Sequence, residues 1–207
     1  MVDLTALAIF AAALFWNSAS PGPSILALVS RTITRGWKDV LPFIAAMWIG
    51  EILWMTCAVA GLAALATNYE NAFLVIKYLG VAYLVYLAWK MWSSPASLEE
   101  EVPTGALVIR ERGKMFMAGL FLTLGNPKIV VFYLALLPTL IDLKMLTIAG
   151  WAVLCLVTMA ILAAIDLTYV ILAQRARKAL KTPAAVRIAN RVGAATLGTA
   201  AAFIASR

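Results

Sequence analysis

A run of apolar residues near the amino terminus is interrupted by two prolines and a glycine within three positions. The run extends from Leu4 to Val29. The break within it is formed by Pro21, Gly22 and Pro23. Each proline lacks a backbone N–H and crowds the carbonyl group four residues earlier, so an unbroken α-helix cannot pass through this segment. The sequence therefore predicts irregular backbone in the middle of an apolar helix.

A second break lies in another apolar run, about a hundred residues later, with the sequence Gly125-Asn126-Pro127-Lys128. Asparagine is a favourable cap for a helix N-terminus, and proline suits the first helical position, where its missing N–H costs nothing. We therefore expect Asn126 to cap a new helix that begins at Pro127. Such prolines can also simply kink packed helices, but two breaks at matched positions favour a functional role.

The distribution of apolar residues indicates a membrane protein. Of the 207 residues, 64% are apolar and 13% are charged, whereas an average soluble domain has about 45–50% and about 25%. The apolar residues form long blocks, as transmembrane helices require. The net charge of +7 comes from basic residues in the short loops between these blocks, which indicates membrane orientation rather than nucleic-acid binding.

The apolar blocks predict an all-α membrane protein with six transmembrane helices. The first and fourth blocks contain the breaks, and the second and fifth each contain one acid, Glu51 and Asp166. This recurring order predicts one domain, 1–207, of two three-helix repeats, and an odd number of spans gives the repeats inverted topology. The expected repeats are 1–92 and 115–207, joined by a polar linker over 93–114, with spans at 4–30, 40–67, 73–92, 115–140, 145–173 and 186–204.

The basic residues predict how the chain lies in the membrane. Of the 17 Lys and Arg residues, 13 follow the first, third and fifth expected spans. By the positive-inside rule those three loops are cytoplasmic. Both termini are then expected to face outward.

The two buried acids are candidates for proton coupling. A charged carboxylate at the centre of a bilayer costs about 2.5 kcal/mol or more, so Glu51 and Asp166 each need a function or a partner. Burial favours the neutral form of a carboxyl group, so such a group can take up and release protons, and it can also pair with a substrate ammonium group. A structural partnership with Lys128 or with a neighbouring hydroxyl is the alternative. The chain contains no histidine, which excludes histidine metal ligands and proton relays, and we expect no metal site and no cofactor.

The two breaks predict a binding site for a carboxylate. A helix N-terminus carries free N–H groups and partial positive charge, which suits an anionic group inside a membrane. Irregular backbone survives there only where protein or a watery cavity satisfies it, so both breaks are expected to face one cavity. The expected substrate-binding residues are Ser20, Pro21, Gly22, Pro23, Asn126, Pro127 and Lys128, with Glu51 and Asp166 as proton-coupling residues.

These motifs resemble those of the LysE/RhtB family of bacterial amino-acid exporters. The resemblance covers essentially the whole chain and implies an exporter of amino acids or their derivatives in the bacterial inner membrane, driven by the proton gradient. Members differ widely in substrate, so it does not select among lysine, threonine and homoserine. The matching segments are Ser20–Pro23, Arg31, Arg35-Gly36, Gly50-Glu51, Leu124–Lys128, 78–84 and 190–193, with serine at position 20 where threonine is frequent.

We therefore expect a secondary transporter rather than an enzyme. It would export a small zwitterionic, amino-acid-like substrate by proton antiport with alternating access. The expected partners are this substrate, protons and the lipid bilayer, with no nucleic acid. The coupling ion, the stoichiometry and the oligomeric state, including a homodimer, are left open.

Two alternatives belong to other functional classes. A passive channel for small polar solutes would need a continuous polar lining, which no expected span carries. An intramembrane enzyme would need Ser20 or Ser24 to pair with Lys128 in a Ser–Lys dyad. The enzyme requires a serine hydroxyl within hydrogen-bond reach of the lysine, whereas the transporter requires both breaks at one cavity.

Overall fold

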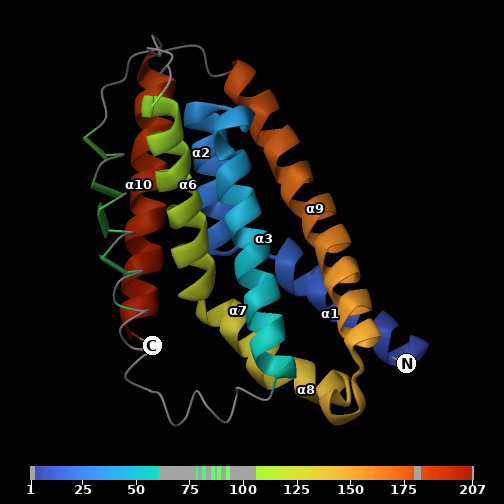
Figure 1. Cartoon of the computed structure of the whole chain (residues 1–207). Helices are drawn as coiled ribbons and strands as arrows, with labels where there is room; N and C mark the ends of the chain where they lie inside the picture. Colours follow the sequence, from blue (N-terminus) through green and yellow to red (C-terminus); the bar gives the residue numbers. More distant parts are fainter. Residues whose placement is uncertain are drawn as a thin grey trace.

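The structure of the chain, a computed structural model, is a bundle of helices (Figure 1). It describes residues 3–60, 106–179 and 183–206 and scattered positions between 78 and 93, and this part contains no strand. The expected all-α fold class is therefore confirmed for the described residues. Their elements are α1 (Leu4–Ala19), α2 (Pro23–Arg35), α3 (Trp37–Val59), α6 (Ala106–Leu124), α7 (Pro127–Val131), the π-helix η1 (Phe132–Leu136), α8 (Leu137–Leu140), the 3-10 helix η2 (Leu143–Met145), α9 (Ile148–Ala179) and α10 (Pro183–Ser206).

Both expected helix breaks are present. α1 and α2 form one bent pair, with an angle of 53° between them, and α6 forms a second pair with the segment from α7 to α8, at 50°. Pro23 and Pro127 each stand at the first position of a helix, as expected. Proline fits there because that N–H has no partner within the helix.

The described chain contains two to four candidate membrane spans. α3 and α9 are each long and apolar enough to cross a membrane, and each bent pair adds one more candidate if it counts as a single span. α10 covers the expected sixth span, while the expected third span, 73–92, lies largely outside the described residues. The arrangement as six spans in two inverted repeats stays a prediction.

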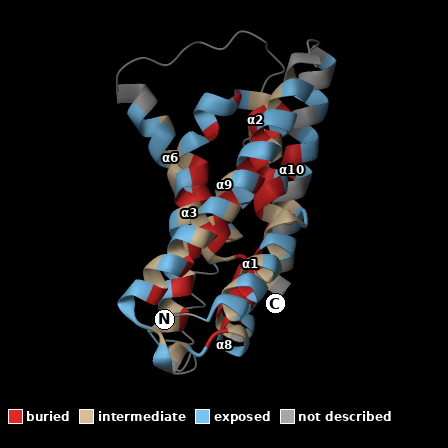
Figure 2. Cartoon of the chain, turned by 90° about the vertical axis from the view of Figure 1, so that its right-hand side faces the viewer, coloured by how far each residue is buried: buried red, intermediate tan, exposed pale blue. Residues whose placement is uncertain are grey.

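The outer surface of the bundle is apolar in a way that suits lipid. Exposed residues follow the outward face of α9 (Figure 2), and several of them are large apolar side chains. A soluble monomer rarely exposes extended apolar surface. These exposed side chains of α9 include Val153, Leu156, Leu167, Ile171 and Leu172.

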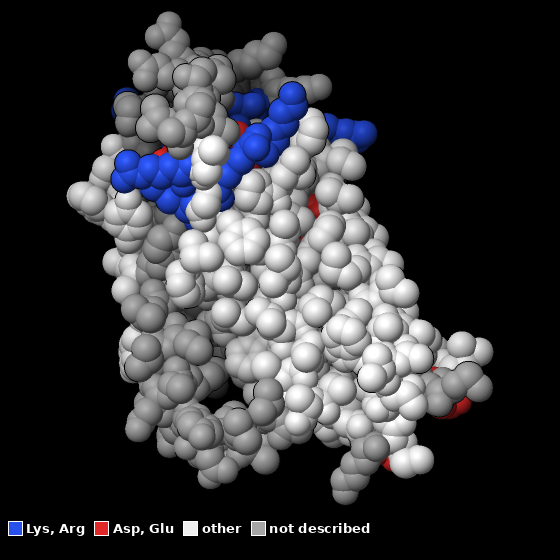
Figure 3. Space-filling model, in the orientation of Figure 1, with Lys and Arg blue, Asp and Glu red and all other residues white. Residues whose placement is uncertain are grey.

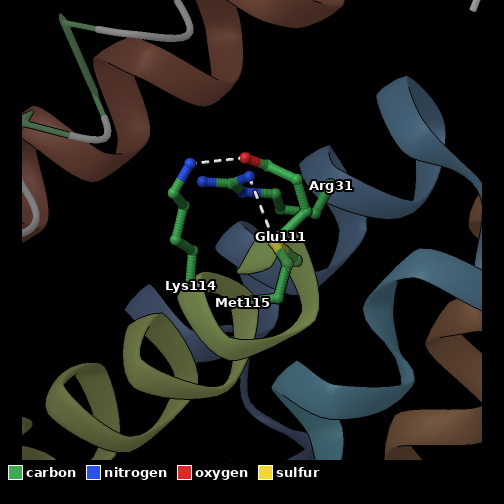
Figure 4. A network of polar contacts seen from close by, with 4 residues as sticks. All are labelled: Arg31, Glu111, Lys114 and Met115. Atoms are coloured by element: carbon green, nitrogen blue, oxygen red, sulfur yellow. Dashed lines mark hydrogen bonds and ion pairs between the residues drawn. The ribbon is translucent and has the colours of Figure 1, made fainter. Parts of the chain in front are cut away.

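α6 begins within the segment expected to be a polar linker. The last part of the expected polar linker over 93–114 is helical, because α6 already begins at Ala106. Good helix formers dominate this stretch, and Glu111 forms an ion pair with Lys114 one turn later. Arg31 of α2 donates to the Sδ atom of Met115 at 3.2 Å (Figure 4), which ties the middle of α6 to α2.

The basic side chains gather at one end of the bundle (Figure 3). Figure 1 shows at this end the end of α2, the beginnings of α3, α6 and α10, and the end of α9, with both chain termini toward the opposite end. This arrangement agrees with the expectation that the basic loops share one side of the membrane. The basic residues near these helix ends include Arg31, Arg35, Lys38, Arg110, Arg112, Lys114, Arg175 and Arg177.

Two apolar clusters fill the interior, and a polar layer lies between them. On α3, Met47 belongs to one cluster and Met55 to the other, and Glu51 stands one turn from each. On α9, Asp166 likewise stands between residues of the two clusters. The two acids therefore lie at the same level along the bundle, away from both of its ends.

α3 and α6 pack closely through two glycines. A Cβ atom at Gly119 would lie 2.3 Å from the backbone oxygen of Phe43, and one at Gly50 would lie 2.8 Å from Cγ2 of Thr123. Small residues allow membrane helices to approach in this way. Because Gly50 precedes Glu51, this packing also holds the acid in position.

We expect Gly119→Ala to destabilise the protein by about 1–3 kcal/mol, because backbone atoms of α3 must move away from the added methyl group. Gly113→Ala, on the same helix, is the matched control, since a Cβ there meets nothing within 4 Å. It should be neutral or stabilising by about 0.5–1 kcal/mol through helix propensity. Thermal unfolding in detergent measures both variants, and equal melting temperatures would contradict the packing described above.

Candidate functional site

The structure brings the two helix breaks together. Asn126 donates from Nδ2 to the hydroxyl of Ser24 at 3.1 Å, and Lys128 donates from Nζ to the backbone carbonyl of Ser20 at 2.8 Å. Asn126 also accepts, through Oδ1, the backbone N–H of Lys128 at 3.1 Å. The asparagine therefore caps α7, as the sequence predicted.

The residues before the three prolines explain why the breaks have their shape. Ser20, Gly22 and Asn126 all have extended backbone. Proline disfavours helical backbone in the residue that precedes it, so each X-Pro pair ends or delays a helix. Gly22 has φ −124°, which any residue can adopt, so its role is not a left-handed turn.

A cavity lies between the two breaks and the two acids. About 370 Å³ of empty space lies among these groups, a figure that includes space open to the outside. The three prolines of the breaks, Pro21, Pro23 and Pro127, do not line the cavity. They affect it by shaping the backbone around it. The lining contains Asn17, Ser18, Ser20, Gly22, Ser24, Glu51, Asn126, Lys128 and Asp166, together with the apolar Ile25, Met47, Ile129 and Leu162.

Each acid accepts a hydrogen bond from the other half of the chain. Glu51 on α3 accepts from the hydroxyl of Tyr133 in η1 at 2.8 Å, and Asp166 on α9 accepts from the indole N–H of Trp48 on α3, also at 2.8 Å. Glu51 is 6% exposed and Asp166 is 2% exposed. Within the described residues no ion pair joins either acid to Lys128, although Lys128 lies close enough to Glu51 to interact with it electrostatically, and Glu51 has the hydroxyl of Tyr133 as its hydrogen-bond partner.

Tyr133 reaches Glu51 from a π-helical turn. In η1, the N–H of Leu137 bonds to the carbonyl of Phe132, five residues earlier. Pro138 follows at once, and a proline there has no N–H for the carbonyl of Leu134 and would crowd it. The wider turn relieves this conflict, and single π-helical turns occur frequently at functional sites.

Lys128 and Tyr169 satisfy the free carbonyl groups at the end of α1. The carbonyl of Ala19 accepts from the hydroxyl of Tyr169 at 2.9 Å, and that of Ser20 accepts from Lys128. An unsatisfied backbone group inside a membrane costs several kcal/mol, so these bonds stabilise the break. They also leave the Ser–Lys alternative without support, because Lys128 donates to a backbone oxygen and the Ser24 hydroxyl accepts from Asn126.

In the part of the chain that the structure describes, the cavity does not continue into a polar path across the bundle. One apolar cluster lies toward the basic end of the bundle, around Leu28, Phe43 and Met47, and the other lies on the opposite side, around Phe10 and Leu137. A passive channel needs polar groups or water along its whole length. The described residues do not provide such a lining.

Comparison with known proteins places the chain in a family. The model of the LysE type translocator family matches residues 15–207. The chain belongs to this family. The membership predicted from the two break motifs is therefore confirmed, and no solved structure matches the chain.

Curated relatives of this LysE type translocator carry names of efflux proteins. The homoserine/homoserine lactone efflux protein of Salmonella typhimurium is 26% identical over 189 residues, which cover 91% of this chain and 90% of the relative. The leucine efflux protein of Salmonella choleraesuis is 31% identical over 122 residues, which cover 59% of this chain and 57% of the relative. An uncharacterised membrane protein of Synechocystis is 27% identical over 158 residues.

Several residues around the translocator's cavity were not predicted as site residues. Tyr133 and Tyr169 lie in apolar runs, where no spacing rule connects them to Glu51 or to the first break. The position of Trp48 in the sequence gives a weak indication of a role inside the protein, because it lies in mid-span, whereas a tryptophan that anchors a helix at the membrane surface lies at a span end. The sequence does contain an indication of the irregular turn that carries Tyr133. Pro138 lies inside the fourth apolar block, and a proline there indicates irregular backbone nearby.

We expect Asn126→Ala to destabilise the protein by about 0.5–2 kcal/mol, because it removes the cap of α7. Asn126→Ser is the matched variant: its hydroxyl oxygen can still cap the N–H of Lys128 without adding a charge at this buried position, but the side chain is too short to replace the bond to Ser24. Thermal unfolding should show a smaller loss for Asn126→Ser than for Asn126→Ala. If alanine is as stable as asparagine at this position, the bond across the two breaks does not stabilise the fold.

Proposed function

We propose that this protein is a secondary transporter that exports amino acids or small amino-acid derivatives from the cytoplasm. The family and the names of the relatives support the transport of amino acids. The observation that carries the proposal is the cavity itself. It combines two helix breaks, one lysine and two buried acids in a polar layer between two apolar clusters.

The cavity offers complementary groups for a zwitterion. Lys128 stands beside the extended backbone of Ser20–Gly22 and supplies a positive charge for the substrate carboxylate, next to the N-terminus of α2. Glu51 and Asp166 supply negative charge for the ammonium group. Ser20, Gly22 and Asn126 line the same space, while Pro21, Pro23 and Pro127 shape the backbone around it.

The proposed transport cycle is alternating access with proton antiport. The bonds from Asn126 to Ser24, from Tyr133 to Glu51 and from Trp48 to Asp166 all join the two halves of the chain, so they must rearrange when the halves move. The substrate enters from the cytoplasm and binds between the halves. A proton from outside neutralises one acid, which weakens the attraction of the ammonium group and releases the substrate outward.

The proposed location is the bacterial inner membrane, with the basic end of the bundle in the cytoplasm. The two apolar clusters on either side of the cavity support a site near the midplane. The six-span arrangement in two inverted repeats accounts for the matched breaks and acids in the two halves.

We expect amino-acid efflux from loaded vesicles to fall about tenfold or more in Glu51→Gln and in Asp166→Asn, because a hydrogen bond to a charged group contributes about 1.5–3 kcal/mol. Asp39→Asn is the matched control, because it removes an exposed carboxylate in the first turn of α3, outside the cavity. Labelled leucine and homoserine are suitable probes. Wild-type rates and unchanged proton coupling in both acid variants would disprove the mechanism.

The orientation is tested with reporter fusions. Alkaline phosphatase fused to the C-terminus should be active, because the enzyme folds only outside the cytoplasm, and a fluorescent protein at the N-terminus should be dark when exported. A phosphatase fusion after Ala179, at the basic end, is the control and should be inactive. A cytoplasmic N-terminus would require the first span to be redrawn.

A further inference from the structure

The two acids of the cavity have hydrogen-bond partners of different chemistry. Glu51 accepts from the phenol hydroxyl of Tyr133, and Asp166 accepts from the indole N–H of Trp48. A hydroxyl group can both donate and accept, whereas an indole N–H can only donate. This difference separates the acid that can change its protonation state from the acid that stays charged.

A proton on Glu51 can be accommodated by rotating hydroxyl groups. The new O–H of Glu51 can donate to the hydroxyl oxygen of Tyr133, and Tyr133 can turn its own hydrogen away from Glu51. Thr158 on α9 is fully buried and lies beside Tyr133, and because its own hydroxyl hydrogen is directed to Sδ of Met55, its oxygen can accept that hydrogen. The contact between Glu51 and Tyr133 therefore persists in both protonation states, and no atom other than hydrogen needs to move far.

A proton on Asp166 has no such accommodation. If it occupied Oδ2, it would face the N–H of Trp48, and the pair would have two hydrogens and no acceptor between them. If it occupied Oδ1, the bond from Trp48 would change from a charge-assisted bond to a neutral one, which is about half as strong. The partner of Asp166 thus favours the ionised carboxylate.

Other titratable groups surround the two acids in the described part of the chain. Lys128 of α7 lines the cavity, and Tyr133 of η1 stands behind Glu51 with Cys155 of α9 next to it. Tyr169 of α9 follows Asp166 by one helical turn and donates to the carbonyl of Ala19. The described parts of α1 and α2 contribute only Asn, Ser, Gly and Ile to the lining. A positive Lys128 and a negative Asp166 complement the carboxylate and the ammonium group of a zwitterionic substrate. The protonation state of Glu51 is then the charge in the cavity that can change during transport.

We infer that Glu51 is the proton carrier of the transport cycle, that Asp166 remains ionised and binds the substrate ammonium group, and that Tyr133 and Trp48 position these two acids for their separate roles. This inference rests on the proposed function. Protonation of Glu51 removes one of the two negative charges near the ammonium group. Proton uptake then promotes substrate release without competition for the same oxygen atoms.

The test uses the purified full-length protein in liposomes and two assays with labelled leucine and homoserine. The first measures flux driven by a pH gradient, and the second measures exchange of internal and external substrate at equal pH, where no net proton movement is needed. Glu51→Gln should lose the gradient-driven flux but keep exchange within about tenfold of the wild type. In Asp166→Asn the KM for exchange should rise about tenfold or more, as expected for a lost charged contact, so both assays should show a large loss at substrate concentrations below KM.

Two conservative variants extend the test to the partners. Tyr133→Phe should reduce gradient-driven flux more than exchange. Trp48→Phe should raise the KM for exchange while the remaining flux still follows the pH gradient. Because each removes only one hydrogen-bonding group, these variants decide the assignment even where Asp166→Asn does not fold.

The outcomes distinguish failure of the inference from failure of the proposed function. If Asp166→Asn exchanges but is uncoupled while Glu51→Gln fails in both assays, the roles of the acids are reversed and the inference is wrong. If Glu51→Gln remains coupled, the inference is also wrong, although antiport stands. If the wild type exchanges substrate but ignores the pH gradient, proton antiport itself is disproved, and with it the inference. A wild type that moves neither amino acid in either assay contradicts the proposed function for these substrates.

Discussion

The structure depends on mutual satisfaction of the two helix breaks. Because α1 ends at Ala19, the carbonyl groups of Ala19 and Ser20 have no following helical turn to bond with. Inside a membrane, water is not freely available to them either. Tyr169 and Lys128, from the other half of the chain, donate to these two carbonyls. The break is therefore stable only in the folded pair of halves, and the same bonds that stabilise it place a lysine and free helix ends beside one cavity.

The polar layer that contains Glu51 and Asp166 lies between the two apolar clusters, because one cluster packs on each side of it. They border the layer on both sides, and in the described part of the chain Glu51 accepts from Tyr133 and Asp166 accepts from Trp48. Because those donors come from the opposite half, a movement of one half against the other changes the surroundings of both acids together. An inverted repeat would supply this coupling in both directions, with each half contributing one acid and one donor.

Local rules were sufficient for the elements that the sequence predicted correctly. Pro23 and Pro127 start helices, and Asn126 caps one, because proline and asparagine act on the backbone of their immediate neighbours. The two acids stood out because a charge inside a long apolar run is costly wherever it lies. At residues 106–114 polar composition indicated a linker, and the structure adds that helix-forming residues and an ion pair extend α6 into it.

The sequence by itself determined the membrane character, the positions of both breaks, the two buried acids and the family, since all of these are written in composition and short motifs. Only the tertiary structure decided what each group contacts. That Tyr133 binds Glu51, that Trp48 binds Asp166 and that Lys128 donates to Ser20 depends on packing between segments about 80 to 120 residues apart. No local preference encodes such pairs, because they form only when closely packed helices and a π-helical turn bring distant side chains to the same layer.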